Sequence, residues 1–70
     1  METRQEKFKR LANKRTNAVL NKLRLLGNLA NRANYDYSED EVRKIFFAID
    51  SQLRTMKAKF SGSIKREFKL

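Results

Sequence analysis

The chain has no proline among its 70 residues and only two glycines, Gly27 and Gly62, so few positions oblige a helix to end. A β-rich fold of this length would need many tight turns, which usually contain glycine or proline. Seventy residues suffice for one small domain, which buries about 60% of the surface of its unfolded chain. We therefore expect an all-α fold without a deep enclosed cleft.

The first helix is predicted over residues 3–33, because apolar and small side chains recur there every three or four positions. They are Phe8, Leu11, Ala12, Ala18, Val19, Leu23, Leu26, Leu29, Ala30 and Ala33. Gly27 falls inside this pattern, where it could kink the helix, end it early or let a partner backbone approach closely. Since the periodicity continues past Gly27, a single helix, straight or bent, is the favoured interpretation.

A loop over residues 34–38 and a second helix over residues 39–60 are expected next. Asn31 and Asn34 suit the left-handed conformation that ends a helix. Ser38 to Glu41 match a capping box, in which the serine oxygen and the glutamate cap each other's backbone amides. The apolar stripe of this helix comprises Val42, Ile45, Phe46, Ile49, Leu53, Met56 and Phe60. Ser61-Gly62-Ser63 is expected to stop it.

Two amphipathic helices joined by so short a loop favour an antiparallel two-helix hairpin as the domain, residues 1–60. A basic C-terminal tail, residues 61–70, follows and could dock or stay mobile. A hairpin leaves part of each apolar stripe uncovered, so we expect the tail or a second copy of the chain to complete it. Phe47 lies more than about 120° from the centre of its stripe, and could be covered by tail residue Phe68 or Leu70 or by a homodimer contact.

The net charge is +9, from 17 Lys and Arg against 8 Asp and Glu. Residues 1–34 hold nine cations and two acids, residues 35–50 two cations and five acids, and residues 51–70 six cations and one acid. An antiparallel hairpin would bring the two basic segments to one end. Such a concentrated excess is typical of proteins that bind nucleic acids, although a merely solvated cationic face is the simpler alternative.

We therefore predict a non-catalytic protein that binds the phosphate backbone of DNA or RNA. Its affinity should depend weakly on base sequence and strongly on salt concentration. On a helical wheel Lys7, Arg10, Lys14 and Arg32 fall within about 60°, with asparagines on the same strip. The candidate nucleic-acid-binding residues are Lys7, Arg10, Lys14, Asn21, Asn28, Arg32, Lys57, Lys59, Lys65 and Arg66. The second hypothesis is a protein-binding adaptor or inhibitor that uses the same basic face against an acidic or nucleic-acid-binding protein.

Ion pairs between an acid and a base four residues later should occupy some cations. The expected pairs are Glu6–Arg10, Glu39–Arg43, Asp40–Lys44 and Asp50–Arg54. Arg15 and Lys22 lie inside the apolar stripe of the first helix. They could extend along the edge of the stripe, form a buried ionic contact with Asp50 or an acid of a second subunit, or line a binding groove.

The chain has neither His nor Cys, so disulfides, the usual zinc sites, cysteine nucleophiles and histidine bases are excluded. The acids of the loop region, Asp36 and residues 39–41, lack the ligand spacing of a calcium loop. Tyr35 and Tyr37 could stack on a base, but closing the loop end of the hairpin is the simpler role. We expect no enzymatic activity, no cofactor and no metal.

No apolar run approaches the roughly 20 residues of a transmembrane helix. The N-terminus also lacks the apolar segment of a signal peptide. These observations favour a cytoplasmic protein that does not enter the membrane. A basic helix lying on anionic lipid is a weaker alternative, because the apolar side of the first helix is needed for the core.

Several segments between Phe8 and Phe60 resemble small basic proteins that phages, plasmids and integrative elements of Gram-positive bacteria encode. The segments are Lys14-Arg-Thr-Asn17, Leu23-Arg-Leu-Leu-Gly-Asn28, Asn34-Tyr-Asp-Tyr-Ser-Glu-Asp-Glu-Val42 and Lys44-Ile-Phe46. That resemblance implies an accessory role in a mobile element. It implies no activity and no functional residue.

Overall fold

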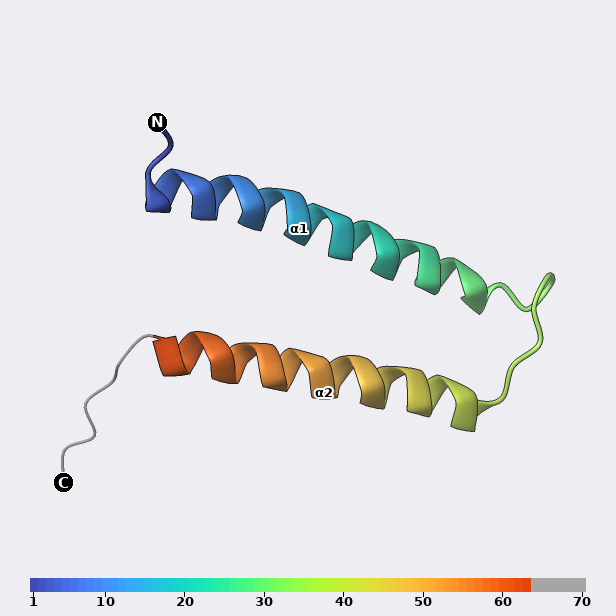
Figure 1. Ribbon diagram of the computed structural model, residues 1–70. Coiled ribbons are helices and arrows are strands. Elements are labelled where there is room, and N and C mark those ends of the chain that lie inside the picture. The colour runs from blue at the N-terminus through green and yellow to red at the C-terminus, as the bar shows by residue number, and fades with distance from the viewer. Residues whose placement is uncertain (64–70) are drawn as a thin grey trace, which may run out of the picture. The chain divides into compact units, whose positions relative to one another are not determined.

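The computed structural model describes residues 1–63. These residues form two long helices and no strand. Helix α1 spans Arg4–Gly27, a short 3-10 helix η1 spans Asn28–Ala30, and helix α2 spans Glu39–Ser63 (Figure 1). The chain divides into two units, Met1–Asp36 and Tyr37–Leu70. The all-α prediction is confirmed, whereas the antiparallel hairpin and its completion by a dimer stay predictions. The end of the predicted tail, residues 64–70, lies outside the described residues.

Helix α1 begins with a capping box that the sequence analysis did not predict. The Glu6 N–H donates to Thr3 Oγ1 at 3.0 Å, and the Thr3 N–H donates to Glu6 Oε1 at 3.0 Å. Two backbone amides that would otherwise lack partners at the helix start are therefore satisfied. The Thr-x-x-Glu spacing is readable in the sequence, so this start could have been found from it.

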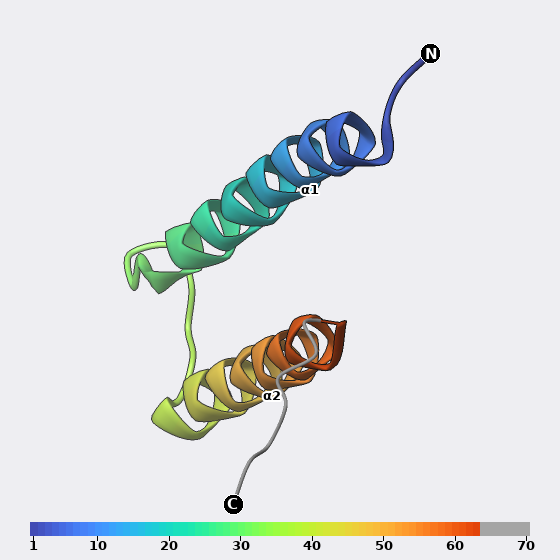
Figure 2. The same ribbon diagram turned by 90° about the vertical axis from the view of Figure 1, so that its left-hand side faces the viewer.

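Helix α1 ends at Gly27, so the prediction of helix up to residue 33 is wrong (Figure 2). Asn31 is extended, its Oδ1 accepts from the Ala33 N–H at 3.0 Å, and its carbonyl accepts from the Asn34 and Tyr35 amides. Asparagine side chains compete for backbone amides in this way, and glycine weakens a helix by about 1 kcal/mol relative to alanine. No described residue has a positive φ, so the left-handed ending expected at Asn31 or Asn34 is also wrong.

Helix α2 begins where the sequence predicts, at the capping box of Ser38 and Glu41. The Ser38 N–H donates to Glu41 Oε1 at 2.8 Å, and the Glu41 N–H donates to Ser38 Oγ at 3.1 Å. The prediction that α2 ends at residue 60 is wrong, because the helix continues through Gly62 to Ser63. Gly62 keeps a negative φ and so stays helical, since glycine lowers helix stability without forbidding the conformation.

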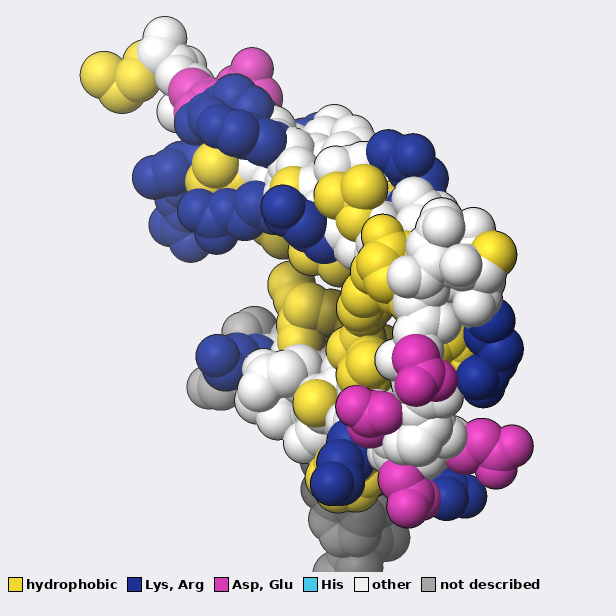
Figure 3. All heavy atoms as spheres, turned by 90° about the vertical axis from the view of Figure 1, so that its right-hand side faces the viewer, with side chains coloured by type: hydrophobic (Ala, Val, Ile, Leu, Met, Phe, Trp, Pro, Cys, Tyr) yellow, Lys and Arg dark blue, Asp and Glu magenta, His cyan; other side chains and the backbone are white. Residues whose placement is uncertain are grey.

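None of the described residues is buried, so neither unit forms a core by itself. The half-buried apolar residues are Leu11, Ala12 and Leu26 in α1 and Val42 and Ile49 in α2, all members of the predicted stripes. Isolated helices of this length depend on packing of an apolar face for most of their stability. The apolar stripes, whose side chains reach the surface in Figure 3, therefore need a covering partner, within this chain or outside it.

Candidate functional site

Helix α1 carries a dense and almost unopposed positive charge. Eight of its 24 residues are Lys or Arg, and its single acid is Glu6. All eight cations are exposed, and Lys and Arg side chains cover much of this helix in Figure 3. The acids, by contrast, gather at the first turn of α2, which contains Glu39, Asp40 and Glu41. The basic part of the predicted site therefore depends on which cations of α1 are free.

Arg10 is not the unpaired cation that the sequence analysis expected. Its Nε donates to Glu2 Oε2 at 2.8 Å and its Nη2 to Glu2 Oε1 at 3.0 Å, and this pairing raises the pKa of Arg10. The expected Glu6–Arg10 pair is absent from the described residues, because the Glu6 carboxylate accepts from the Thr3 N–H. The same hydrogen bonds with Thr3 lower the pKa of Glu6.

The predicted strip of cations and asparagines does not continue to Arg32. Arg32 lies in the turn over residues 32–34, so it does not share a face of α1 with Lys7 and Lys14. Asn28, at the C-cap of α1, keeps helical φ and ψ, and its N–H donates to the Arg24 carbonyl. Asn21 does lie on α1, where its Oδ1 accepts from Arg24 Nη2 at 2.6 Å. The continuous 60° sector that included Arg32 is thus wrong, because it required helix through residue 33.

Five exposed cations on one side of α1 form no ion pair and no side-chain hydrogen bond within the described residues. We call them the basic face: Arg4, Lys7, Lys14, Arg15 and Lys22. At 3.6 residues per turn they lie within an arc of about 100°, and at 1.5 Å per residue they extend over about 27 Å. Lys7 and Lys14 were predicted site residues. Arg4 was missed because it lies outside the 60° sector predicted from Lys7, Arg10, Lys14 and Arg32.

Leu11, Ala18 and Leu25 run along the middle of the basic face, between its cations. Leu11 and Ala18 also belong to the apolar stripe of α1, so the basic face and the stripe overlap. Arg15 and Lys22 lie in this overlap, and both are exposed. Their exposure in α1 fits side chains that extend along the edge of the stripe. The other two roles considered for this pair involve a partner surface and stay predictions.

The cations of α2 have a different environment. Arg43 forms an ion pair with Asp40, three residues before it. Within the described residues none of the predicted pairs Glu39–Arg43, Asp40–Lys44 and Asp50–Arg54 forms. Lys57 and Lys59 are exposed in the last third of α2, and their convergence with the basic face stays a prediction. Lys65 and Arg66 lie outside the described residues.

Residues 1–63 contain no candidate metal centre. No group of three Asp, Glu, His or Cys side chains in this range could hold a metal ion. Two hollows that are open to solvent lie on α2 around Phe47. Of the helices that the structure describes, neither is long and apolar enough to span a membrane.

No protein-family model, curated protein or solved structure matches this chain.

Proposed function

We propose that the protein is a non-catalytic nucleic-acid-binding protein that contacts phosphates through the basic face of α1. The observation that carries this proposal is the set of five unpaired cations on one side of a helix with a single acid. Each cation that neutralises a phosphate releases a condensed counterion, and this release drives binding. Lys and Arg side chains of this kind fix a protein on the backbone without reading sequence.

The length of the basic face fits a backbone of repeating phosphates. Lys7 and Lys14 are two helical turns apart, about 10.5 Å along the axis. Asn21 and Asn28 are expected to act as neutral donors beside them. Asn21 has its Oδ1 engaged by Arg24, which leaves its amide group as the donor for a phosphate oxygen. Binding of this kind is expected to tolerate any base sequence.

The remaining proposed contacts depend on the hairpin. If α1 and α2 pack antiparallel, Lys57 and Lys59 approach the start of α1, and Lys65 and Arg66 extend the same surface. The resemblance to small basic proteins of phages, plasmids and integrative elements supports an accessory role in a mobile element. DNA and RNA are both included, because phosphates are common to them.

The direct test is a fluorescence anisotropy titration against duplex DNA, single-stranded DNA and RNA of mixed sequence. The double variant Lys7→Gln with Lys14→Gln should bind at least about tenfold more weakly, because two phosphate contacts are lost. The matched control is Lys9→Gln with Lys44→Gln, which removes the same charge from the opposite side of α1 and from α2. Equal weakening in both variants, or none in either, would contradict the proposed face.

A protein-binding adaptor or inhibitor is the second candidate function, and the exposed apolar stripes favour it. Phe8 is 53% exposed and Phe46 60% exposed, and each is a member of the stripe of its helix. A pull-down from lysate with and without nuclease separates the two candidates. Partners lost on nuclease treatment favour nucleic-acid binding, and partners retained favour the adaptor.

A further inference from the structure

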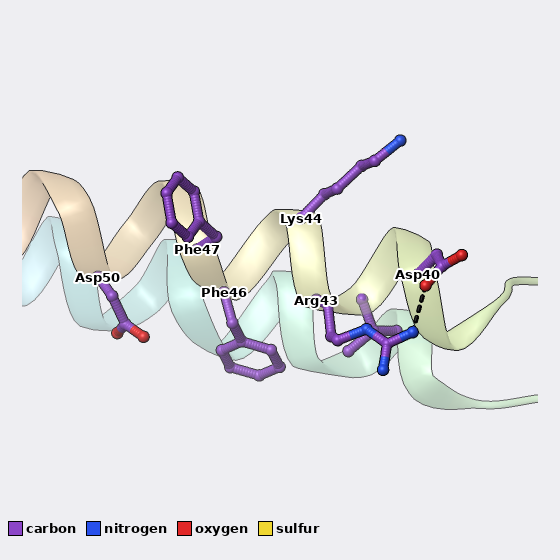
Figure 4. Close-up of a pocket in the computed structure, with 7 residues that line it drawn as sticks. Asp40, Arg43, Lys44, Phe46, Phe47 and Asp50 are labelled. Carbon is purple, nitrogen blue, oxygen red and sulfur yellow. Dashed lines mark hydrogen bonds and ion pairs between the residues drawn. The ribbon is translucent and has the colours of Figure 1, made fainter.

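Phe47 is exposed on a side of α2 that neither the basic face nor the apolar stripes explain. Its side chain is 70% exposed, more than that of any other described Phe or Tyr. It points away from the apolar stripe, and Phe46 diverges from it to another side of the helix (Figure 4). A single exposed aromatic needs no explanation by itself. Its surroundings supply two further observations.

The first observation is the shape of the surface beside Phe47. One open hollow of about 600 Å³ includes Arg43, Phe46, Phe47 and Asp50 in its lining, and Figure 4 draws these side chains on α2. A second hollow of about 330 Å³ includes Asp50, Leu53, Arg54 and Lys57. Within each lining, these four residues have the spacing i, i+3, i+4, i+7. Four residues at that spacing form the hole into which a side chain of a second helix inserts.

The second observation is the order of charges on either side of Phe47. The acids Glu39 and Asp40 precede it by eight and seven residues, and the bases Arg54 and Lys57 follow it by seven and ten. Closer to Phe47 the order is inverted, with Arg43 before it and Asp50 after it. Reversing the direction of the helix about Phe47 therefore exchanges acids for bases.

We propose that this side of α2 binds a second copy of α2 in antiparallel orientation, across a two-fold axis beside Phe47. We call it the Phe47 face: Glu39, Asp40, Arg43, Phe47, Asp50, Arg54 and Lys57. Phe47 of each copy enters the hole beside Phe47 of the other. Asp40 then faces Arg54 of the second copy, and Arg43 faces Asp50. A two-fold contact of this kind uses one self-complementary patch twice.

The charge pattern selects the antiparallel orientation. A parallel second copy would place Asp40 against Asp40 and Arg54 against Arg54, which is repulsive. In the single chain Arg43 already pairs with Asp40, so in the dimer its guanidinium lies between Asp40 and the second copy's Asp50. Exposed ion pairs contribute little each, and Phe47 is the one large apolar side chain of the face. The dimer is therefore concentration-dependent and weakened by salt.

The test is sedimentation equilibrium of the full chain over a wide range of protein concentration at low salt. The wild type should show a monomer–dimer equilibrium. Phe47→Ala should weaken dimerisation by at least about tenfold, because the inserted side chain is lost from both copies. The matched control is Leu20→Ala, which removes an exposed side chain from α1 and should leave dimerisation unchanged.

Charge reversal tests the orientation. Asp40→Arg alone places two arginines together, and Arg54→Asp alone places two aspartates together, so each variant should dimerise about tenfold more weakly. An equimolar mixture of the two single variants restores both opposite-charge pairs and should recover the wild-type strength. Circular dichroism confirms that each variant keeps its helix content.

Three outcomes would overturn the proposal: a wild type that stays monomeric, Phe47→Ala that dimerises normally, or a mixture that does not recover. If the wild type stays monomeric, the C-terminal tail or another protein would be the contact partner of Phe47. The Phe47 face shares no residue with the basic face of α1. Failure of either proposal therefore leaves the other standing.

Discussion

Arg10 and Glu2 form a two-pronged ion pair, with Arg10 Nε 2.8 Å from Glu2 Oε2 and Arg10 Nη2 3.0 Å from Glu2 Oε1. Planar guanidinium and carboxylate groups match in this geometry, which is the strongest form of such a pair. Because of this contact, Arg10 is not a free cation near the start of α1. Glu2 thus limits the positive charge that α1 can offer to a polyanion.

Replacing Glu2 with glutamine should strengthen nucleic-acid binding. The change frees Arg10 to contact a phosphate, so the slope of log affinity against log salt should steepen by about 0.9 for duplex DNA. The measurement is the same anisotropy titration, repeated at several salt concentrations. Glu39→Gln is the control, since it removes an acid that forms no ion pair in the described residues. An identical change in both variants would show that only net charge matters.

The two capping boxes should make helix content depend on pH in the acid range. Hydrogen bonds from the Thr3 backbone and then its side chain lower the pKa of Glu6 below 4.5, and those of Ser38 do the same for Glu41. A lowered pKa in the folded state stabilises the helix above pH about 4.5, and this contribution is lost as the pH falls through the folded-state value. Circular dichroism should therefore show helix content falling below that pH.

Glu41→Gln isolates the contribution of one box to this titration. Glutamine keeps a side-chain oxygen that accepts from the Ser38 N–H, but it does not titrate. The variant should lose part of the acid-range change in helix content, and Glu39→Gln, which lies outside the capping box, is its matched control. An unaltered pH profile in Glu41→Gln would contradict the assignment of this transition to the capping box.

Gly27→Ala should extend α1 and stabilise it. Gly27 has φ −62° and ψ −29°, which alanine adopts without strain, and a β-carbon there would meet no atom within 4 Å. The gain is about 0.5–1 kcal/mol, since alanine loses less conformational freedom on folding. Thermal unfolding followed by circular dichroism measures it. Destabilisation would instead indicate that a partner backbone approaches α1 at this glycine.

Ile49→Ala tests whether the apolar stripe of α2 is covered in solution. Ile49 is half-buried, and a covered stripe would bury it further. The substitution should then cost about 2–5 kcal/mol in free energy of unfolding, measured in urea. Leu20→Ala, at an exposed position outside the predicted stripe of α1, is the control. A cost below about 0.5 kcal/mol for Ile49→Ala would mean that nothing packs on this stripe.

The sequence predicts that both helices exist and where α2 begins, because periodicity and the Ser38 capping box are local signals. The early end of α1 could not be read in the same way. The apolar spacing continues through Leu29 and Ala33, while backbone hydrogen bonds to Asn31 break the helix. Gly62 was expected to end α2, but it stays helical.

The site was predicted only in part. The density of cations on α1 follows from the composition of the sequence, whereas the ion pairs depend on side-chain conformations that the sequence does not specify. Lys7 and Lys14 belong to the basic face as expected. Arg10 reaches back eight residues to Glu2 instead of pairing with Glu6, and no rule of helical spacing foresees that contact. Sequence spacing along one helix also does not fix how a second helix packs on it.

The salt dependence of binding tests the central claim, that α1 holds nucleic acid through phosphates, most directly. Five contacts from the basic face predict that log affinity for duplex DNA falls against log salt with a slope of about −4.5. The Lys7→Gln, Lys14→Gln double variant should reduce this slope by about 1.8, and the Lys9→Gln, Lys44→Gln control should leave it nearly unchanged. A wild-type slope near zero, or equal slopes in the two variants, would contradict the claim.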